Sequence, residues 1–491
     1  MNLLTKFLAA FALIVFLLTG PVVAQRLEGQ AVTWTNFDYI YSVASSIEHV
    51  YFATTGGIIR FNKIDYRWED PLTGADGAVG EVAKRIGVSR FDDRLYITTD
   101  LGHYEYDFLF DRWSPINGIP RIDNDNRHVD PPQILLPEFN ANYMGRGEFV
   151  DYQGRSFLAS DVVDDNSGDL WIGTWGYGPA TADKSSGLTR LLPYGLLQSR
   201  VNAILPDDTV IWVSGAVLND FRAGLTAFNP EENSFYYVES GVNFSFPAVD
   251  VNCLAADGDK LYVGTPVGLY YVSRNSWNTR GPFKRSTGLL DDNVISLGVM
   301  GRELYVGTAA GLSMVDQVTD SIFQIYPKTF FNQIVYELLP VDSTLWIASE
   351  TGAYRYTPAT GRLQEFQDSD LVLFGRVYDI TRAGDKLWFS SDNGVVSLDL
   401  TTGENASIKD ISRRSDSRAI AANDRIVAYA SNRGLTVRFL DRKKPFSRVF
   451  TTGDGLASDN VFSLYMDGPY LWIGSDEGLT RFLWDNPQRV D

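Results

Sequence analysis

DGLASDNVFSLYMDGPYLWIGSDEGLTRF, at residues 454–482, contains three short runs in which apolar and polar residues alternate. Glycine, aspartate and asparagine separate these runs, as they do where strands turn. Alternation with a period of two is typical of β-strands that have one buried face. The segment therefore predicts three strands of one small sheet.

The middle run of this segment recurs along the whole chain. Successive copies are about 40 to 50 residues apart, except for one gap of 75 residues between the second copy and the third. A period of this length is typical of propeller blades, which contain four strands each. The copies are VYFAT at 50, LYITT at 95, LWIGT at 170, IWVSG at 211, LYVGT at 261 and 304, LWIAS at 345, LWFSS at 387, VAYAS at 427 and LWIGS at 471.

The repeat predicts an all-β fold, a single β-propeller of about ten four-stranded blades over residues 25–491, with eight to ten blades allowed by the pattern. The last copy has no fourth strand, whereas residues 31–37, AVTWTNF, form a strand without a sheet of its own. We expect this N-terminal strand to pair with the last blade and close the ring. Two separate five-blade rings would need a second unpaired strand.

The units resemble the two-component regulator propeller repeat, which combines a Gly-Leu turn, Asn-x-Val-x-Ser-Leu, Leu-Trp-Ile-Gly-Thr and Gly-Leu-x-Arg-Tyr. Residues 454–482 match this pattern, and so do residues 287–316, TGLLDDNVISLGVMGRELYVGTAAGLSMVD. The resemblance extends from about residue 32 to 485 and implies a periplasmic sensor of carbohydrate-like ligands. The family's usual sandwich domain, membrane span and kinase do not follow, so the resemblance does not imply signal transduction by this chain itself.

The N-terminus predicts export. Lys6 precedes an apolar run at residues 7–18, and small residues lead up to Ala24. This order is typical of a secretory signal peptide, so we expect residues 1–24 to be removed. An uncleaved anchor is the alternative, but the run is shorter than the roughly 20 residues that span a bilayer. No cysteine follows it, so the sequence predicts a periplasmic or secreted protein that is not a lipoprotein and has no membrane span after cleavage.

Composition limits the partners and the chemistry. The formal net charge is -18, and an acidic surface repels nucleic acid and anionic lipid, so neither is an expected partner. Cys253 is the only cysteine, which excludes internal disulfides. It takes the position of Ala203 and Ser296 in other repeats, so we expect a small core residue and not a reactive thiol.

Catalytic motifs are absent. The chain has no GxSxG elbow, phosphate loop, HExxH or CxxCH motif, so we predict no catalytic residue and no cofactor. Of the three histidines, His128 is the best candidate for a site because it lies in an insertion. The acidic stretch at 164–169, DDNSGD, offers ligands for calcium. Other repeats carry turn residues at the same position, so we expect a turn there and no metal.

Three irregularities of the repeat predict the place of a binding site. An insertion spans about residues 117–156, a long loop spans 216–223, and WIGTWGYG at 171–178 lies between them. Long loops in compact domains are usually functional or disordered. The insertion either forms part of a site or covers the ring, and both alternatives are open. Residues just before the inner strands are also expected to surround the central opening. The candidate ligand-binding residues are Trp175, Tyr177, Arg200, Asp220, Arg222, Asp250, Asn293, Arg376, Asn460 and His128.

The leading hypothesis is a non-catalytic exported protein that binds an oligosaccharide or an envelope protein. A concave pocket would favour a small ligand, whereas a flat apolar patch would favour a protein partner. One alternative is a polysaccharide hydrolase or lyase that uses His128, Asp161 or Asp220. The other is a structural scaffold of an envelope or secretion assembly. The fold alone does not decide among these functions.

Overall fold

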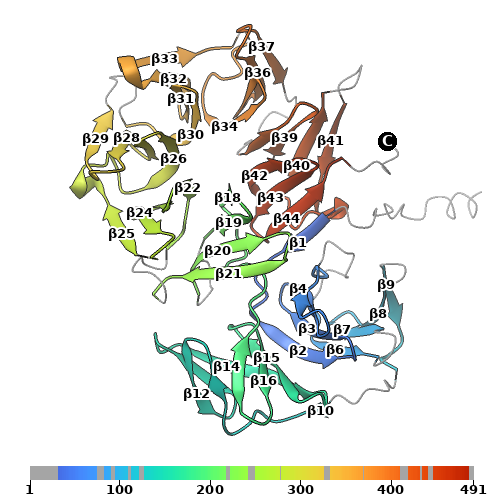
Figure 1. Ribbon diagram of the computed structural model, residues 1–491. Helices are drawn as coiled ribbons and strands as arrows, with labels where there is room; N and C mark the ends of the chain where they lie inside the picture. Colours follow the sequence, from blue (N-terminus) through green and yellow to red (C-terminus); the bar gives the residue numbers. More distant parts are fainter. Residues whose placement is uncertain are drawn as a thin grey trace, which may run out of the picture.

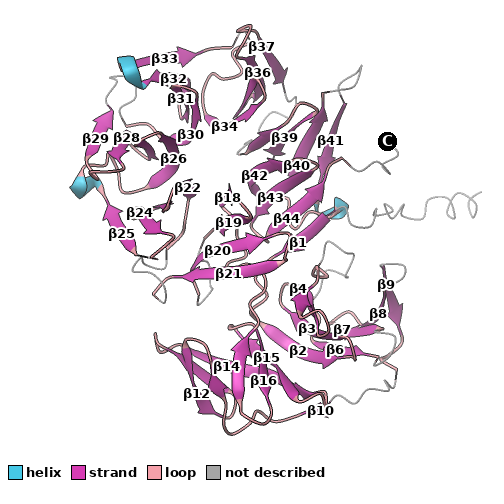
Figure 2. Cartoon of the chain, in the orientation of Figure 1, coloured by secondary structure: helices cyan, strands magenta, loops and turns pink. Residues whose placement is uncertain are grey.

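The computed structural model describes residues 31–73, 82–89, 94–108, 112–120, 127–216, 222–241, 249–276, 278–325, 332–368, 370–409, 419–431, 434–440 and 446–485. Its regular structure is almost entirely β-strand (Figure 2), which confirms the all-β prediction. The helices are three single 3-10 turns, η2(Arg285–Thr287), η3(Pro358–Thr360) and η4(Thr452–Asp454). No helix in these ranges is long and apolar enough to cross a membrane. The predicted signal peptide at 1–24 lies outside the described residues.

Seven four-stranded sheets form a ring (Figure 1). Their strands are β18(Ala203–Asp207), β19(Val210–Ser214), β20(Gly224–Asn229), β21(Ser234–Glu239), β22(Cys253–Asp257), β23(Lys260–Thr265), β24(Gly268–Ser273), β25(Thr279–Phe283), β26(Val294–Met300), β27(Glu303–Thr308), β28(Gly311–Asp316), β29(Ile322–Ile325), β30(Val335–Val341), β31(Thr344–Ser349), β32(Gly352–Thr357), β33(Arg362–Phe366), β34(Val377–Ala383), β35(Lys386–Ser391), β36(Gly394–Asp399), β37(Asn405–Lys409), β38(Ile420–Ala422), β39(Ile426–Ser431), β40(Gly434–Phe439), β41(Phe446–Phe450), β42(Val461–Asp467), β43(Tyr470–Ser475), β44(Leu479–Leu483) and β1(Ala31–Trp34). The first strands meet in the order β18, β22, β26, β30, β34, β38, β42 and again β18.

The other three sheets form an open row beside the ring, drawn in blue to teal in Figure 1. Their strands are β2(Ile40–Ser45), β3(His49–Thr54), β4(Gly57–Asn62), β5(Arg67–Trp68), β6(Arg85–Val88), β7(Leu95–Thr98), β8(His103–Asp107), β9(Arg112–Ile116), β10(Arg127–His128), β11(Leu136–Pro137), β12(Ala141–Gly145), β13(Glu148–Asp151), β14(Ser156–Asp164), β15(Asp169–Trp175), β16(Pro179–Asp183) and β17(Leu188–Leu191). The first strands meet in the order β6, β2, β14, so the third sheet along the chain lies beside the first.

The N-terminal strand closes the ring as predicted. β1 is antiparallel to β44, with Ala31 opposite Phe482 and Trp34 opposite Leu479, and it supplies the fourth strand of the last sheet. The described strands also form ten sheets, as the repeat count predicts. The prediction of one ring of ten blades is wrong, however, because only seven of these sheets share the ring.

Contacts between neighbouring sheets explain how the chain divides. At three contacts between sheets of the ring, a valine at the start of one sheet packs against a glycine in the second strand of the neighbouring sheet. Val294 packs on Gly264 and Val335 packs on Gly307 in this way, and a Cβ on either glycine would come within 2.7 Å of the valine. Neighbouring sheets therefore pack closely at these points because a valine side chain of one sheet fills the space that a glycine of the other leaves free.

At one point, the valine–glycine contact joins two sheets that are not consecutive in the chain. Val201 follows the third sheet in sequence, and chain order would place it on Gly173. It packs instead on Gly474 of the last sheet, and its backbone N–H donates to Ser475 at 2.8 Å. Ile40 of the first sheet takes the place against Gly173. The chain therefore leaves the ring after β1, builds the row, and re-enters the ring at Val201.

Both ends of the row are finished without a second closing strand. At one end, the insertion adds β12 and β13 to the edge of β14, and Phe149 packs with Phe157 and Tyr177 in a buried cluster. At the other end, the face of β7 and β8 that points away from the first sheet carries Tyr96, Thr98, His103 and Glu105, with His103 3.0 Å from Thr98. Terminal repeats with a covered or polar face need no further neighbour. The expectation of a single ring assumed that every blade has two neighbours, and the row does not.

One continuous hydrophobic cluster joins the row to the ring. Trp34, only 1% exposed, stacks on Trp472 and packs at a tilted angle against Phe228, both in the ring. In the same cluster, Tyr194 stacks on Trp68 of the row with ring centroids 4.5 Å apart. Large aromatic contacts of this kind dominate core energetics, so the two parts pack as one body.

Candidate ligand-binding site

Five candidates lie at the same end of the ring, just before the first strands of five sheets. We call this end the ring mouth. A first strand is the innermost of its sheet, so side chains at its start surround the axis around which the seven strands meet. The five residues are Arg200, Asp250, Asn293, Arg376 and Asn460.

Two tyrosines form the aromatic part of the ring mouth. Tyr336 and Tyr378 come from neighbouring sheets, and their ring centroids are 5.2 Å apart with an interplanar angle of 53°. The Tyr378 hydroxyl donates a 2.6 Å hydrogen bond to Asp392. Arg376 is exposed beside this pair. An aromatic face flanked by a guanidinium and a carboxylate offers both stacking and hydrogen bonds to a ligand.

Polar contacts continue around the ring mouth. The guanidinium of Arg200 lies 4.3 Å from the centroid of the Phe462 ring, and its Nε donates to the Asn202 side chain at 3.0 Å. The Asn252 amide donates to the Asn293 side chain at 3.0 Å. These bonds hold the side chains in fixed positions, which lowers the entropy cost of binding a ligand.

Sequence reasoning missed the aromatic residues of this site. Tyr336, Tyr378 and Phe462 each follow the first valine of an inner strand, and Tyr378 and Phe462 lie two positions after the candidates Arg376 and Asn460. Asn202 and Asn252 occupy that same position in two other sheets. The signal was present in the register of the repeat, because side chains two positions apart in a strand point to the same face.

Trp175 belongs to the row and not to the ring mouth. Its side chain is 40% exposed, and Tyr39 and Tyr41 meet it edge-on at centroid distances of 5.4 and 5.0 Å. This arrangement leaves part of the indole open to solvent. Trp175 is therefore a second aromatic surface, separated from the five candidates of the ring.

Tyr177 and Arg222 are buried at the junction of the row and the ring. Arg222 forms ion pairs of 2.9 Å with Asp38 and 3.0 Å with Glu239, and its guanidinium lies 5.0 Å from the Tyr177 ring. Burial raises the pKa of Tyr177 to about 12. Both side chains are less than a tenth exposed. They connect the two parts of the protein and do not face solvent.

The insertion reaches the same junction. Arg155 pairs with Asp151 at 2.6 Å and with Glu239 of the ring at 2.7 Å. The Gln153 amide donates to the carbonyl of Ser240 at 3.0 Å. The three irregularities of the sequence therefore lie together, but their described residues form a buried polar junction. Asp220 lies outside the described residues.

His128 is paired with an acidic residue of the row. Its Nδ1 lies 2.7 Å from Asp161, and this hydrogen bond raises the pKa of His128, while the nearby Arg85 opposes the rise. The other carboxylate oxygen of Asp161 accepts the backbone N–H of Val43 at 2.8 Å. His128 is 57% exposed, so the pair is open to solvent on one side. Two of the three residues named in the enzyme alternative, His128 and Asp161, therefore contact each other in the row and not at the ring mouth.

The acidic stretch at 164–169 forms a turn. Asp165 accepts from Lys63 at 2.8 Å and from the Trp171 indole at 3.1 Å, and Asp164 accepts the backbone N–H of Asn166 at 2.9 Å. Across the described ranges, no group of three or more acidic, histidine or cysteine side chains is arranged to hold a metal. Cys253 packs against Gly264, and burial raises the pKa of its thiol.

Comparison with known proteins, by sequence and by structure, shows that the fold is similar to that of one solved structure at a TM-score above 0.5. No protein-family model matches the chain, and no curated protein matches its sequence. The structure is similar to PorZ, described as an essential bacterial surface component of the type-IX secretion system of Porphyromonas gingivalis. The sequences are 12% identical over 93% of this chain and 87% of that one, with a TM-score of 0.58.

Two extracellular domains are also among its structural neighbours. The extracellular domain of a putative hybrid two-component system from B. thetaiotaomicron is 13% identical, over 91% of this chain and 70% of that one, with a TM-score of 0.49. A second such domain from B. thetaiotaomicron is 16% identical over 90% and 60%, with a TM-score of 0.47. At these identities the likeness concerns the fold.

Proposed function

We propose that this chain is an exported, non-catalytic protein that binds an oligosaccharide at the ring mouth. The observation that carries the proposal is the pair Tyr336 and Tyr378 beside Arg376, with Asp392 fixed by the Tyr378 hydroxyl. A sugar ring presents an apolar C–H face for stacking and hydroxyl groups for charged and amide partners. The ring mouth offers both kinds of contact side by side.

The polar remainder of the ring mouth supports the same ligand class. Arg200, Asn202, Asn252 and Asn293 supply hydrogen-bonding groups that are already held by neighbouring side chains. A chain of sugar units lying across the opening would meet these groups after leaving the tyrosine pair. Export to the periplasm or beyond the cell, as the N-terminal sequence predicts, would give the protein access to such a ligand.

The test is a glycan array combined with thermal-shift assays on residues 25–491. A specific glycan should bind the wild-type protein and lose at least tenfold in affinity in Tyr378→Ala and Arg376→Ala, since stacking and charge-assisted hydrogen bonds each contribute about 1–2 kcal/mol. Phe323→Ala is the matched control, because Phe323 is 53% exposed on an outer strand.

Two results would contradict the assignment. Loss of binding in Trp175→Ala with full binding in Tyr378→Ala would move the site to the row. No binding to any glycan by the folded protein would remove the carbohydrate ligand.

A structural role in an envelope or secretion assembly is a second candidate. An apolar patch on the outside of the row supports it: Leu136 lies opposite Leu188, and Ile134 beside them is 73% exposed. PorZ, which shares the fold, is described as a surface component of a secretion system. If the patch binds a protein, native gels of solubilised envelopes should show the chain in a larger complex that Ile134→Asp and Leu188→Asp disrupt. Unchanged migration of both variants would exclude the patch.

A further inference from the structure

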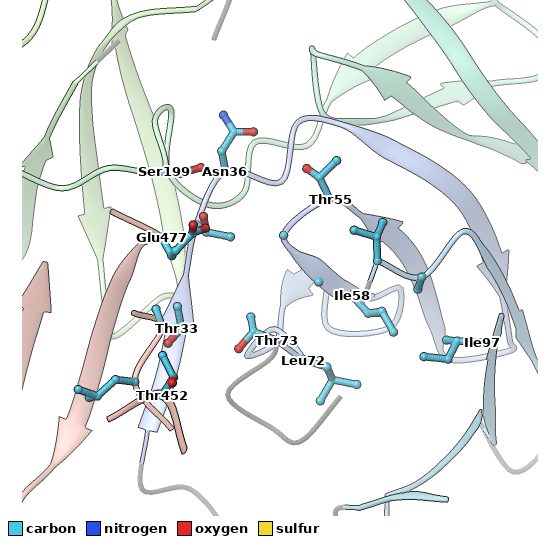
Figure 3. Close-up of a pocket in the computed structure, with 17 residues that line it drawn as sticks. Thr33, Asn36, Thr55, Ile58, Leu72, Thr73, Ile97, Ser199, Thr452 and Glu477 are labelled. Atoms are coloured by element: carbon cyan, nitrogen blue, oxygen red, sulfur yellow. The ribbon is translucent and has the colours of Figure 1, made fainter. Parts of the chain in front are cut away.

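A cleft with a volume of about 610 Å³ lies between the row and the ring (Figure 3). Its walls come from turns of the first two row sheets, from the segment after β1 and from the last ring sheet. Ligand sites commonly have volumes of roughly 300–1,000 Å³. No candidate of the ring mouth lines this cleft, so it is a separate place for a ligand.

The cleft has a single charged group among its described lining residues. Glu477 lies in the turn between β43 and β44, and Figure 3 shows it on the same wall as Thr33 and Thr452. Glu477 is exposed to solvent; its partial burial, and then the charge of the adjacent Asp476, raise its pKa, and no described cation lowers this pKa. One carboxylate oxygen of Asp476 is buried without a hydrogen-bond partner among the described residues. This turn therefore has negative charge that no described side chain neutralises.

The opposite wall of the cleft is largely apolar. Ile58, Leu72 and Ile97 of the row and Leu456 of the ring line it, and each is at most 6% exposed, so only a small part of each side chain borders the cleft. Figure 3 places Ile58, Leu72 and Ile97 across the cleft from Glu477. Apolar surface of this kind stabilises an aliphatic group by removing it from water. No aromatic residue lines the cleft in the described ranges, so it lacks the stacking surface of the ring mouth.

We propose that the cleft binds a primary ammonium group that carries an aliphatic chain. The ammonium would pair with Glu477, and the exposed hydroxyl of Thr452 would accept one of its remaining hydrogen bonds. The aliphatic chain would lie against Ile58 and Leu72. An anionic ligand is disfavoured, because a carboxylate without a cation repels it. A free alkylamine and the N-terminus of a peptide share this chemistry.

Calorimetric titration of the full chain with hexylamine, hexanol and hexanoate tests the charge requirement. Hexylamine should bind, and hexanol and hexanoate should bind at least about tenfold more weakly, the usual effect of one charge-assisted hydrogen bond. Leucyl-leucine amide and its N-acetylated form separate the two sources. Tighter binding of the free peptide than of hexylamine assigns the site to a peptide N-terminus, and the reverse assigns it to a small amine.

Variants locate the site. Glu477→Gln should weaken hexylamine binding about tenfold, and Ala457→Phe should block it by filling the cleft. Glu404→Gln, at an exposed glutamate just before β37, is the matched control and should bind normally. Tyr378→Ala should also bind normally, so failure of the glycan proposal leaves this one standing. Equal binding of hexylamine and hexanol, or unchanged binding in both Glu477→Gln and Ala457→Phe, would overturn the proposal.

Discussion

Asp379 of the ring and Asp161 of the row occupy the same position of the repeat but have different neighbours. Each lies opposite the fifth residue of the second strand, and each accepts a backbone N–H from the inner strand of a neighbouring sheet, Ile420 of β38 or Val43 of β2. In the ring, burial raises the pKa of Asp379 to about 6. In the row, the equivalent carboxylate is paired with a histidine.

The difference follows from closure. In the ring, neighbouring inner strands bring Glu337 and Asp379 together, and burial followed by the charge of Asp379 raises the pKa of Glu337. In the row, the edge of the inner strand β14 is free to pair with β10, and β10 supplies His128. In the closed ring, the buried carboxyl groups therefore lie next to carboxyl groups of neighbouring repeats. In the open row, an inserted strand can bring a histidine beside the equivalent carboxyl group.

Trp34→Ala should have the largest effect, because Trp34 belongs both to the strand that closes the ring and to the cluster that joins ring and row. We expect a loss of about 3–5 kcal/mol in the free energy of unfolding, typical of a buried tryptophan. Urea unfolding followed by circular dichroism measures it. Val318→Ala, at a residue 73% exposed, is the control. A loss below 1 kcal/mol would show that this strand does not hold the two parts together.

Arg222→Met should separate the row from the ring. The substitution leaves the carboxylates of Asp38 and Glu239 buried without the Arg222 guanidinium. Removing one partner of a buried ion pair lowers the free energy of unfolding by roughly 3 kcal/mol or more. Differential scanning calorimetry should show the single transition of the wild type split into two. Arg302→Met removes an exposed pair with Asp316 and should leave one transition. One unsplit, unshifted transition in Arg222→Met would contradict the role of the junction.

Phe149→Leu should weaken the row alone. Phe149 is 1% exposed where the insertion covers the end of the row, and a smaller side chain there should cost about 1–2 kcal/mol. Hydrogen exchange should rise in β14–β17 and stay unchanged in β26–β36. Faster exchange in both regions to the same degree would mean that the insertion does not act as the end of a separate unit.

Glu337→Gln should change the pH dependence of the ring. Carboxyl groups with pKa values raised by folding bind protons more tightly in the native state, so their contribution is present at low pH. It is lost as pH rises from about 4, the unfolded value, through about 6 and above. The amide cannot ionise, so the variant should gain stability relative to wild type as pH rises from 4 to 7, by roughly 1 kcal/mol. A constant difference between the two proteins across this range would refute the account.

The sequence predicts the parts of this molecule better than their arrangement. Strand alternation and the LWIGT-like repeat indicate the ten sheets, and the unpaired AVTWTNF indicates the closing strand β1. The division into ring and row depends on whether Val201 meets Gly173 or Gly474. Both glycines occur in the same motif, so local pattern cannot distinguish them.

The sequence could indicate only part of the candidate site, because local patterns show positions in the repeat but not contacts between distant segments. Residues before the inner strands could be located from the repeat, and Arg376 and Arg200 lie at the ring mouth. Arg222 and Tyr177 looked like surface residues because they follow irregular loops. Their burial depends on Asp38 and Glu239, which come from distant segments, and such pairing has no local signal in the sequence.

The central claim is that seven sheets form a closed ring and three sheets lie outside it. Cross-linking tests this claim most directly. In a Cys253→Ala background, Arg200→Cys with Phe462→Cys should cross-link through a short bis-maleimide, because Arg200 contacts Phe462 in the last ring sheet. Arg200→Cys with Ser160→Cys should not, because the third sheet lies in the row. A cross-link to position 160 and none to position 462 would restore a single ring in chain order and contradict the account.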